Sequence, residues 1–158
     1  VRSWSKNGIP EIRSPFATRP WQHVLEPLSG YISLAIALSQ NEELNGEAFN
    51  FGPPAYQNHT VKELVDEIIN HWEGAKWLDK SQENTAPLEA GLLKLNCDKA
   101  LHSLGWQATL NVKETAKWTG EWYRTFYEKG PESANLKTLN QIKDYMAIAT
   151  ERNTFKLS

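Results

Sequence analysis

A short stretch near the start of the sequence carries the residue types that bind phosphate. Arg13, Arg19, Trp21 and His23 lie close together around one predicted turn. Arginine presents planar, bidentate donors that match phosphoryl oxygens, and a neighbouring indole offers a flat apolar wall for a base or a sugar. The local pattern alone fits a solvated surface arginine and a core tryptophan somewhat better than it fits an anion site.

Other chemistries find little support in the residue pattern. The nine glycines form no glycine-rich phosphate loop, and none of the five tyrosines is followed four residues later by lysine, so no dinucleotide site is predicted. The four histidines are scattered without ligand spacing, which argues against a metal site. Cys97, the single cysteine, precedes a predicted helix with no nearby base and is expected to pack rather than react. No catalytic residue is predicted.

Length and composition favour one globular domain over residues 1–158. A net charge of −2 gives no field that would favour nucleic acid or an anionic membrane, and no apolar run approaches the roughly 18 residues of a membrane span. One cysteine fits a reducing compartment, so the cytoplasm is the expected location. The chain starts without Met on what resembles the tail of a longer helix, which suggests a fragment.

Short strands and amphipathic helices are expected to alternate in the first half of the chain. Strands are predicted over 10–13, 21–24 and 48–51 because apolar or β-branched residues there are bounded by turn residues. Between them, a helix with Pro27 in its first turn is predicted to end before Asn45. Its apolar residues fall on one face: Leu28, Ile32, Ala35 and Ile36.

Capping patterns dominate the predictions for the second half. Thr60 with Glu63 predicts a helix start, followed by an apolar stripe of Val61, Leu64, Val65, Ile68, Ile69 and Trp72. A strand is predicted over 92–95, with Asn96 capping a short helix that ends at Leu104. Further caps are predicted at Asn111 with Glu114, for a helix closed by Gly130, and at Thr138 with Gln141, for a last helix. The alternation predicts a mixed α/β fold.

Three longer motifs resemble a known family. They are the stretch from Arg13 to Tyr31, which contains Arg19-Pro20-Trp21-Gln22-His23; Phe49-Asn50-Phe51-Gly52-Pro53; and 89–100 with Leu104-Gly105-Trp106. Together they resemble the C-terminal, substrate-binding portion of CDP-glucose 4,6-dehydratases, within the extended short-chain dehydrogenase/reductase superfamily. The first motif is fairly specific to this family, and the other two are shared more widely. The likeness spans nearly the whole chain.

The resemblance implies roles for individual residues. Arg19 matches the arginine that holds the substrate pyrophosphate, Asn50 the asparagine beside it, and Ile12 and Arg13 the strand edge that meets the nucleobase. Trp21, His23 and Glu89 also match family positions, and His23 is as well suited to supporting Arg19 as to touching ligand. Departures from the family pattern are Leu88, where His is usual, and Asn96, where Asp is usual.

The resemblance further implies an NAD-dependent lyase that acts on CDP-glucose in deoxysugar biosynthesis. The NAD site and the catalytic groups would belong to a Rossmann half that this sequence lacks, so the chain alone is expected to bind no NAD and to be inactive, with a homo-oligomer possible. Two alternatives remain: a related dehydratase or epimerase acting on a dTDP- or GDP-sugar, and an autonomous carbohydrate- or protein-binding module that uses the seven tryptophans for stacking.

Overall fold

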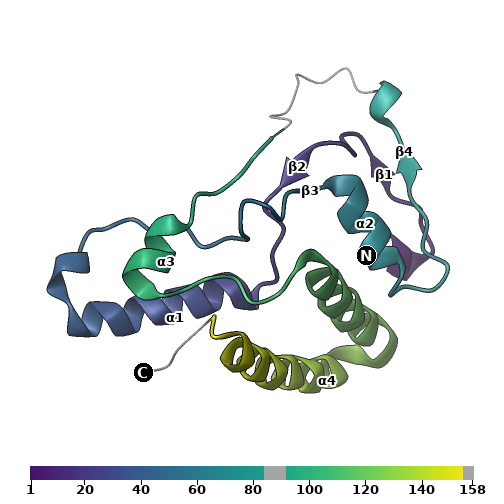
Figure 1. Ribbon diagram of the computed structural model, residues 1–158. Coiled ribbons are helices and arrows are strands. Elements are labelled where there is room, and N and C mark those ends of the chain that lie inside the picture. The colour runs from purple at the N-terminus through teal and green to yellow at the C-terminus, as the bar shows by residue number, and fades with distance from the viewer. Residues whose placement is uncertain (84–91, 155–158) are drawn as a thin grey trace.

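The computed structural model describes residues 1–83 and 92–154, in which four α-helices combine with short strands and three 3₁₀ turns (Figure 1). The class is mixed α/β, as the sequence predicts. Helices α1 and α3 lie at one end, and α2 with the strands lies at the other. In this part of the chain, no helix has the length and apolar character needed to cross a membrane.

The strands form two separate two-stranded sheets. β1 (Glu11–Ile12) runs parallel to β4 (Leu78–Asp79), and β2 (Thr18–Arg19) runs antiparallel to β3 (His59–Thr60). β1 confirms the strand predicted over 10–13. Every strand is only two residues long, so the sheets join loops together rather than forming a layer of their own.

The strand predicted over 21–24 is wrong. The Trp21 N–H donates to the carbonyl of Arg19 at 2.9 Å, and the Glu26 N–H donates to the carbonyl of His23 at 3.0 Å. These two tight turns lead the backbone out of β2 and directly into the first helix. The sheet strand therefore lies two residues before the predicted one, at Thr18–Arg19.

The stretches predicted as strands over 48–51 and 92–95 belong to neither sheet. Within the described residues, no backbone hydrogen bond joins 48–51 to another segment. The local pattern of alternating residues was therefore insufficient to predict a sheet strand. A strand also needs a neighbouring segment that supplies hydrogen-bond partners for its backbone.

Helix α1 (Leu25–Gln40) confirms the helix predicted from Pro27, although its apolar side is not the side that packs inward. The inward face carries small and polar residues, namely Glu26, Ser29, Gly30 and Ser33. Leu28 and Ile32, from the apolar face, stay 45% and 50% exposed. The helix gives way to the 3₁₀ turn η2 (Glu42–Leu44) before Asn45, as predicted.

Helix α2 (Val61–Ile69) begins at the predicted capping box, in which the Thr60 hydroxyl accepts from the Glu63 N–H at 3.1 Å. Its apolar stripe is half-buried and packs against the last helix. Helix α3 (Asp98–Leu104) starts one residue later than Asn96 predicts, with Cys97 at the cap position. The Asn96 side chain nevertheless accepts from the Asp98 N–H at 2.9 Å.

The longest helical element, α4 (Val112–Arg152), is a hairpin of two helices. Its first half starts at the predicted Asn111–Glu114 capping box and ends at Gly130, whose φ of 83° and ψ of 178° interrupt the helix. Pro131 then opens the second half, which suits the first turn of a helix. The helix start predicted at Thr138 is wrong, because its hydroxyl lies inside the second half and donates to the Ala134 carbonyl at 2.9 Å.

Two small apolar clusters hold these elements together. One gathers Phe51, Ala100 and Trp106 where α3 and the segment after α1 meet α1. The other contains Leu110, Tyr145 and Ala149, where the second half of α4 returns to the start of α1. Both clusters therefore pack against α1, which is the central element of this end of the molecule.

Candidate functional site

Arg19 ends β2, and Trp21 follows it two residues later, outside the sheet. Arg19 pairs in register with His59, and one of its guanidinium nitrogens donates to the carbonyl of Thr18 at 2.8 Å. The indole N–H of Trp21 donates to the carbonyl of His59 at 3.1 Å. Both side chains are half-buried. The backbone of Arg19 and the indole of Trp21 are thus both tied to His59 of β3.

Asn50 lies on a segment tied to the same region. The Gln22 side-chain amide donates to the carbonyl of Phe51 at 3.0 Å, which joins the stretch after Trp21 to the residue after Asn50. The exposed amide of Asn50 donates to the carbonyl of Asn96 at 3.2 Å. Pro20, which follows Arg19, lies at one small hollow, together with Pro53, Pro54, Ala55, Gln57, Asn58, Leu93, Lys94 and Leu95.

Ile12 and Arg13 lie on or beside the other sheet. Ile12 pairs with Asp79, and its carbonyl accepts from the Lys80 N–H at 2.9 Å. Arg13 follows at the end of β1 with an exposed side chain. Glu89, together with Leu88, lies outside the described residues, so the predicted contact at Glu89 stays a prediction.

His23 is buried just before α1, against the first half of α4. Its ring meets Trp118 edge-on at 5.7 Å between centroids, and Nδ1 accepts from the Leu25 N–H at 3.3 Å. Burial lowers the pKa of His23 to about 4, so the ring is neutral at physiological pH. It borders a pocket of about 480 Å³ that is also lined by Trp122 and Tyr123.

The sequence analysis missed one buried carboxylate that has several hydrogen-bond partners. Glu26 is fully buried on the inner face of α1. Its carboxylate accepts from the backbone N–H groups of Thr109 and Leu110 at 2.9 and 2.7 Å, and from the Tyr145 hydroxyl at 2.8 Å. Burial raises the pKa of Glu26, and the three hydrogen bonds oppose that rise.

A chain of side chains extends this contact. The Trp106 indole donates to the Ser29 hydroxyl at 2.8 Å, and the Ser29 and Tyr145 hydroxyls lie 2.9 Å apart. Burial and the nearby Glu26 carboxylate raise the pKa of Tyr145. We call Glu26, Ser29, Trp106 and Tyr145 the buried joint, because they connect α1 to α4 and to the segment between α3 and α4.

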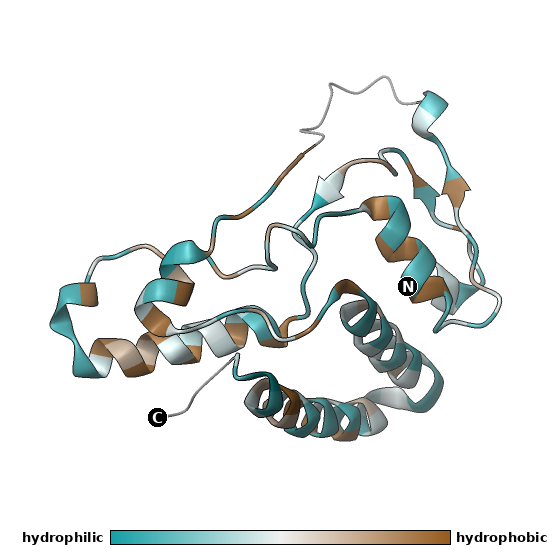
Figure 2. Cartoon of the chain, in the orientation of Figure 1, coloured by the Kyte–Doolittle hydropathy of each residue, from teal (hydrophilic) through white to brown (hydrophobic). Residues whose placement is uncertain are grey.

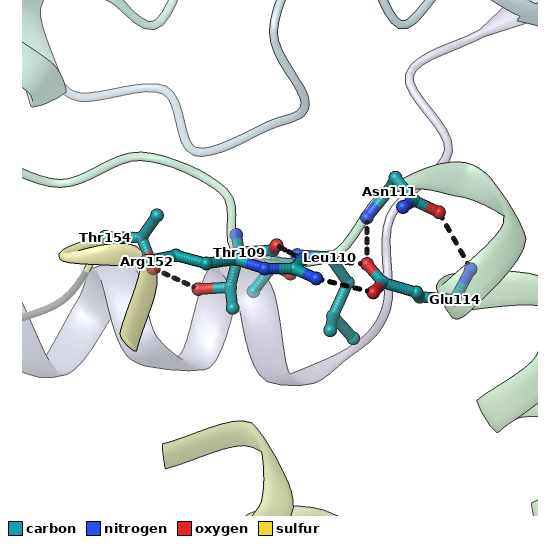
Figure 3. Close-up of polar contacts among 7 residues, drawn as sticks. Thr109, Leu110, Asn111, Glu114, Arg152 and Thr154 are labelled. Atoms are coloured by element: carbon teal, nitrogen blue, oxygen red, sulfur yellow. Dashed lines mark hydrogen bonds and ion pairs between the residues drawn. The ribbon is translucent and has the colours of Figure 1, made fainter. Parts of the chain in front are cut away.

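An ion pair reinforces the joint at its outer edge (Figure 3). Arg152, in the last turn of α4, contacts both carboxylate oxygens of Glu114 at 2.7 and 2.9 Å and donates to the Thr109 carbonyl at 2.6 Å. Glu114 also accepts from the Asn111 N–H at 2.9 Å. The Glu114 carboxylate thus accepts hydrogen bonds at both the start and the end of the α4 hairpin. The sequence predicted the contact between Asn111 and Glu114 but not the contacts that Arg152 makes.

Cys97 shows no sign of activation. Burial is the main cause of a raised pKa for its thiol, with a smaller contribution from the Asp98 carboxylate. A raised pKa lowers the thiolate fraction and with it the nucleophilicity. The packed role expected from sequence is therefore supported. Within 1–83 and 92–154, no three metal-ligating side chains gather into a group.

Comparison with known proteins adds a relative of stated activity. No protein-family model matches the chain. Over 155 residues it is 38% identical to a CDP-glucose 4,6-dehydratase from Salmonella typhimurium. The chain resembles part of a CDP-glucose 4,6-dehydratase. The match covers 95% of this chain but 41% of the relative, so the chain spans about two fifths of the relative's length. The predicted resemblance is confirmed.

Most of the tryptophans of this dehydratase-like chain take part in packing. None of the seven is exposed: Trp4 and Trp106 are buried, and the others are half-buried. Several indole N–H groups are also bonded internally, for example that of Trp122 to the Thr138 hydroxyl at 2.7 Å. A carbohydrate-stacking module would present open indole faces, so the packing argues against that alternative.

Proposed function

We propose that residues 1–158 form the substrate-binding portion of a CDP-glucose 4,6-dehydratase and hold the nucleotide diphosphate of CDP-glucose. The observation that carries this proposal is the 38% identity spread over 95% of the chain. A match of that extent includes the segments on which Arg19 and Asn50 lie. The reaction itself, dehydration of the sugar to its 4-dehydro-6-deoxy form, is part of the proposal for the whole enzyme.

Arg19 is the proposed ligand of the pyrophosphate. Its backbone is fixed by pairing with β3, and a guanidinium group makes two parallel, charge-assisted hydrogen bonds to phosphoryl oxygens. Asn50, exposed and tied to the carbonyl of Asn96, would add a neutral donor or acceptor beside it. Trp21 offers an apolar wall whose position is set by its bond to His59.

Ile12 and Arg13 are the proposed contacts to the nucleobase. A strand edge can read a base through its backbone groups. Because β1 is held on one side by β4, only its other edge remains for such contacts. Binding energy from this end of the substrate, remote from the reacting carbons, would position the sugar for reaction.

An NAD-dependent reaction requires a dinucleotide site, and the residues present do not fit one. The sequence has no two glycines at the spacing of a dinucleotide-binding loop. Among the described residues, the glycines with positive φ are far apart in sequence: Gly46, Gly74, Gly105 and Gly130. We therefore derive no step through NAD in this chain, and we expect the 158 residues alone to show no turnover of CDP-glucose.

The test is calorimetric titration of CDP into a chimaera in which these residues replace the matching segment of the Salmonella dehydratase. Losing a bidentate contact in a closed site costs on the order of 2 to 4 kcal/mol. Arg19→Ala should therefore weaken binding by roughly 30- to 1000-fold, at tenfold per 1.4 kcal/mol. Arg19→Lys should recover only part of this loss, because a point charge does not reproduce the fork.

The matched control is Arg124→Ala, which removes a surface arginine of α4 whose side chain is 40% exposed and paired with Glu128. It should leave CDP affinity unchanged. Affinity for CDP close to wild type in Arg19→Ala would remove Arg19 from the site. Tighter binding of dTDP or GDP than of CDP would replace the proposed substrate with that of a related enzyme.

A further inference from the structure

The Gln22 side chain joins two segments that carry proposed substrate contacts. Gln22 follows Arg19 by three residues. Its side-chain amide nitrogen donates to the carbonyl of Phe51, the residue after Asn50, at 3.0 Å. Phe51 is buried, and the apolar cluster that contains it packs against Leu34 of α1, a helix along which apolar residues recur (Figure 2). The bond from Gln22 therefore ends on a well-packed residue, directly beside Asn50.

The position of Asn50 depends on few other polar contacts. In the described part of the chain, no backbone hydrogen bond joins 48–51 to another segment. The Asn50 side chain donates to the carbonyl of Asn96, but this bond is exposed, so water competes for both groups. The bond from Gln22 is partly buried, because it ends on the buried residue Phe51. It is therefore well placed to fix where Asn50 lies.

Only one half of the Gln22 amide makes a hydrogen bond within the described residues. The side-chain carbonyl oxygen is buried, and no described group donates a hydrogen bond to it. Burying an acceptor without a donor is unfavourable. Methionine has nearly the same length and volume, so it would avoid this penalty and lose one hydrogen bond. Stability alone therefore gives little reason for glutamine here, and departures of this kind are expected at functional sites.

We propose that Gln22 is a positioning residue, which holds Asn50 in place relative to Arg19 so that both contact one substrate diphosphate. The inference rests on the proposed function, in which Arg19 and Asn50 share that ligand. The amide nitrogen of Gln22 is bonded to Phe51 and its oxygen is buried, so Gln22 acts through Asn50 and makes no ligand contact of its own. Groups that meet one ligand must be held within about 0.5 Å of the productive geometry.

The test is calorimetric titration of CDP into the chimaera with the Salmonella dehydratase, carrying Gln22→Met, Asn50→Ala or both. Loss of one neutral contact costs about a factor of ten in affinity, which is the loss expected of each single variant. Because Gln22 acts only through Asn50, the double variant should also lose about tenfold, whereas independent contacts would lose roughly 100-fold. A role of Gln22 in stability alone would not produce this pattern.

The matched control is Gln141→Met. Gln141 is buried in the second half of α4, and its side-chain amide likewise donates to a backbone carbonyl, that of Trp118, at 2.9 Å. The substitution removes the same kind of bond and should shift the urea midpoint at least as far as Gln22→Met does, while CDP affinity changes by less than about twofold. If Gln22→Met does not unfold cooperatively, Gln22→Leu replaces it. If neither folds, Gln22 supports the fold itself and the proposal fails.

CDP affinity of Gln22→Met within about twofold of wild type would overturn the proposal. A roughly 100-fold loss in the double variant would also overturn it, because Gln22 would then act independently of Asn50. The same holds for an unchanged affinity in Asn50→Ala. If Arg19→Ala weakens CDP binding while Gln22→Met does not, the proposed function stands and only this inference fails. If the chimaera binds no CDP, both fail.

Discussion

The buried joint and the surface around Arg19 differ in how their polar groups are satisfied. In the joint, the Glu26 carboxylate is fully buried and accepts three hydrogen bonds from groups far along the chain. Around Arg19, the side chains are half-buried or exposed, and those of Arg19, Trp21 and Asn50 donate to backbone carbonyls. The comparison indicates that the joint stabilises the fold, whereas the Arg19 surface is where we propose that a ligand binds.

The largest expected effect is the loss of stability in Glu26→Ala. Removing the carboxylate leaves the N–H groups of Thr109 and Leu110 buried without an acceptor, and each unsatisfied group costs about 1–3 kcal/mol. We expect a loss of about 4 kcal/mol in the free energy of unfolding, measured by urea denaturation. Glu26→Gln keeps one acceptor oxygen and should lose about half as much.

The control for that prediction is Glu73→Ala, because the Glu73 side chain is 92% exposed. Its effect should stay within about 0.5 kcal/mol. If Glu26→Ala cost no more than Glu73→Ala, the joint would not be what stabilises this end of the molecule, and the contrast between the two regions would disappear.

A somewhat smaller effect is expected from His23, which lies between the two regions in sequence. Its pKa is lowered from 6.5 to about 4 by burial, so between these pH values the unfolded chain binds a proton that the folded chain does not. Stability is fully present above pH 6.5 and is lost as the pH falls toward 4, by about 3 kcal/mol at 1.36 kcal/mol per pH unit.

Urea denaturation of His23→Asn over the same pH range isolates this effect. The asparagine side-chain oxygen can replace Nδ1 as the acceptor for the Leu25 N–H but does not titrate, so the loss of stability attributed to His23 should vanish. Glu26, whose raised pKa stabilises the fold as the pH falls, acts in both proteins and cancels in the comparison. His102→Asn, at an exposed position of α3, should keep the wild-type pH dependence. An unchanged slope in His23→Asn would contradict the prediction.

The smallest expected effect is at Asn50. Its hydrogen bond to Asn96 is exposed, and water replaces such a bond readily, so Asn50→Ala should cost less than about 1 kcal/mol in the same urea measurement. A loss above about 2 kcal/mol would show that the Arg19 surface supports the fold as the joint does. Asn45→Ala, at an exposed turn position, provides the matched control.

The helices could be predicted from sequence because their signals are local. Both capping boxes, at Thr60 and at Asn111, place the acceptor and its donor three residues apart, and both are present in the structure. The strands were harder to predict, because pairing of β2 with β3 joins Thr18 to Thr60 across the length of α1. No local pattern specifies which stretches will meet.

The role of Glu26 could not be predicted for a similar reason. A glutamate in the first turn of a helix normally faces water and interacts favourably with the helix dipole. Here its partners, Thr109 and Tyr145, are 83 and 119 residues away. The apolar face of α1 was identified correctly, but which face turns inward depended on these distant polar groups. For the candidate site, Arg19 and Trp21 were predicted from the sequence. The structure adds that the backbone of Arg19 and the indole of Trp21 both contact His59 of β3.

The reversal of the chain at Gly130 has a consequence for the order of folding. Across the α4 hairpin, Trp122 and Thr138 meet at a separation of only 16 residues, and helix formation is itself local and fast. Closing the loop between Glu26 and Tyr145, at a separation of 119, costs about 2 kcal/mol more in chain entropy. We therefore expect the α4 hairpin to assemble first and to serve as the surface on which α1 is captured, with Glu26 engaged only in the last step.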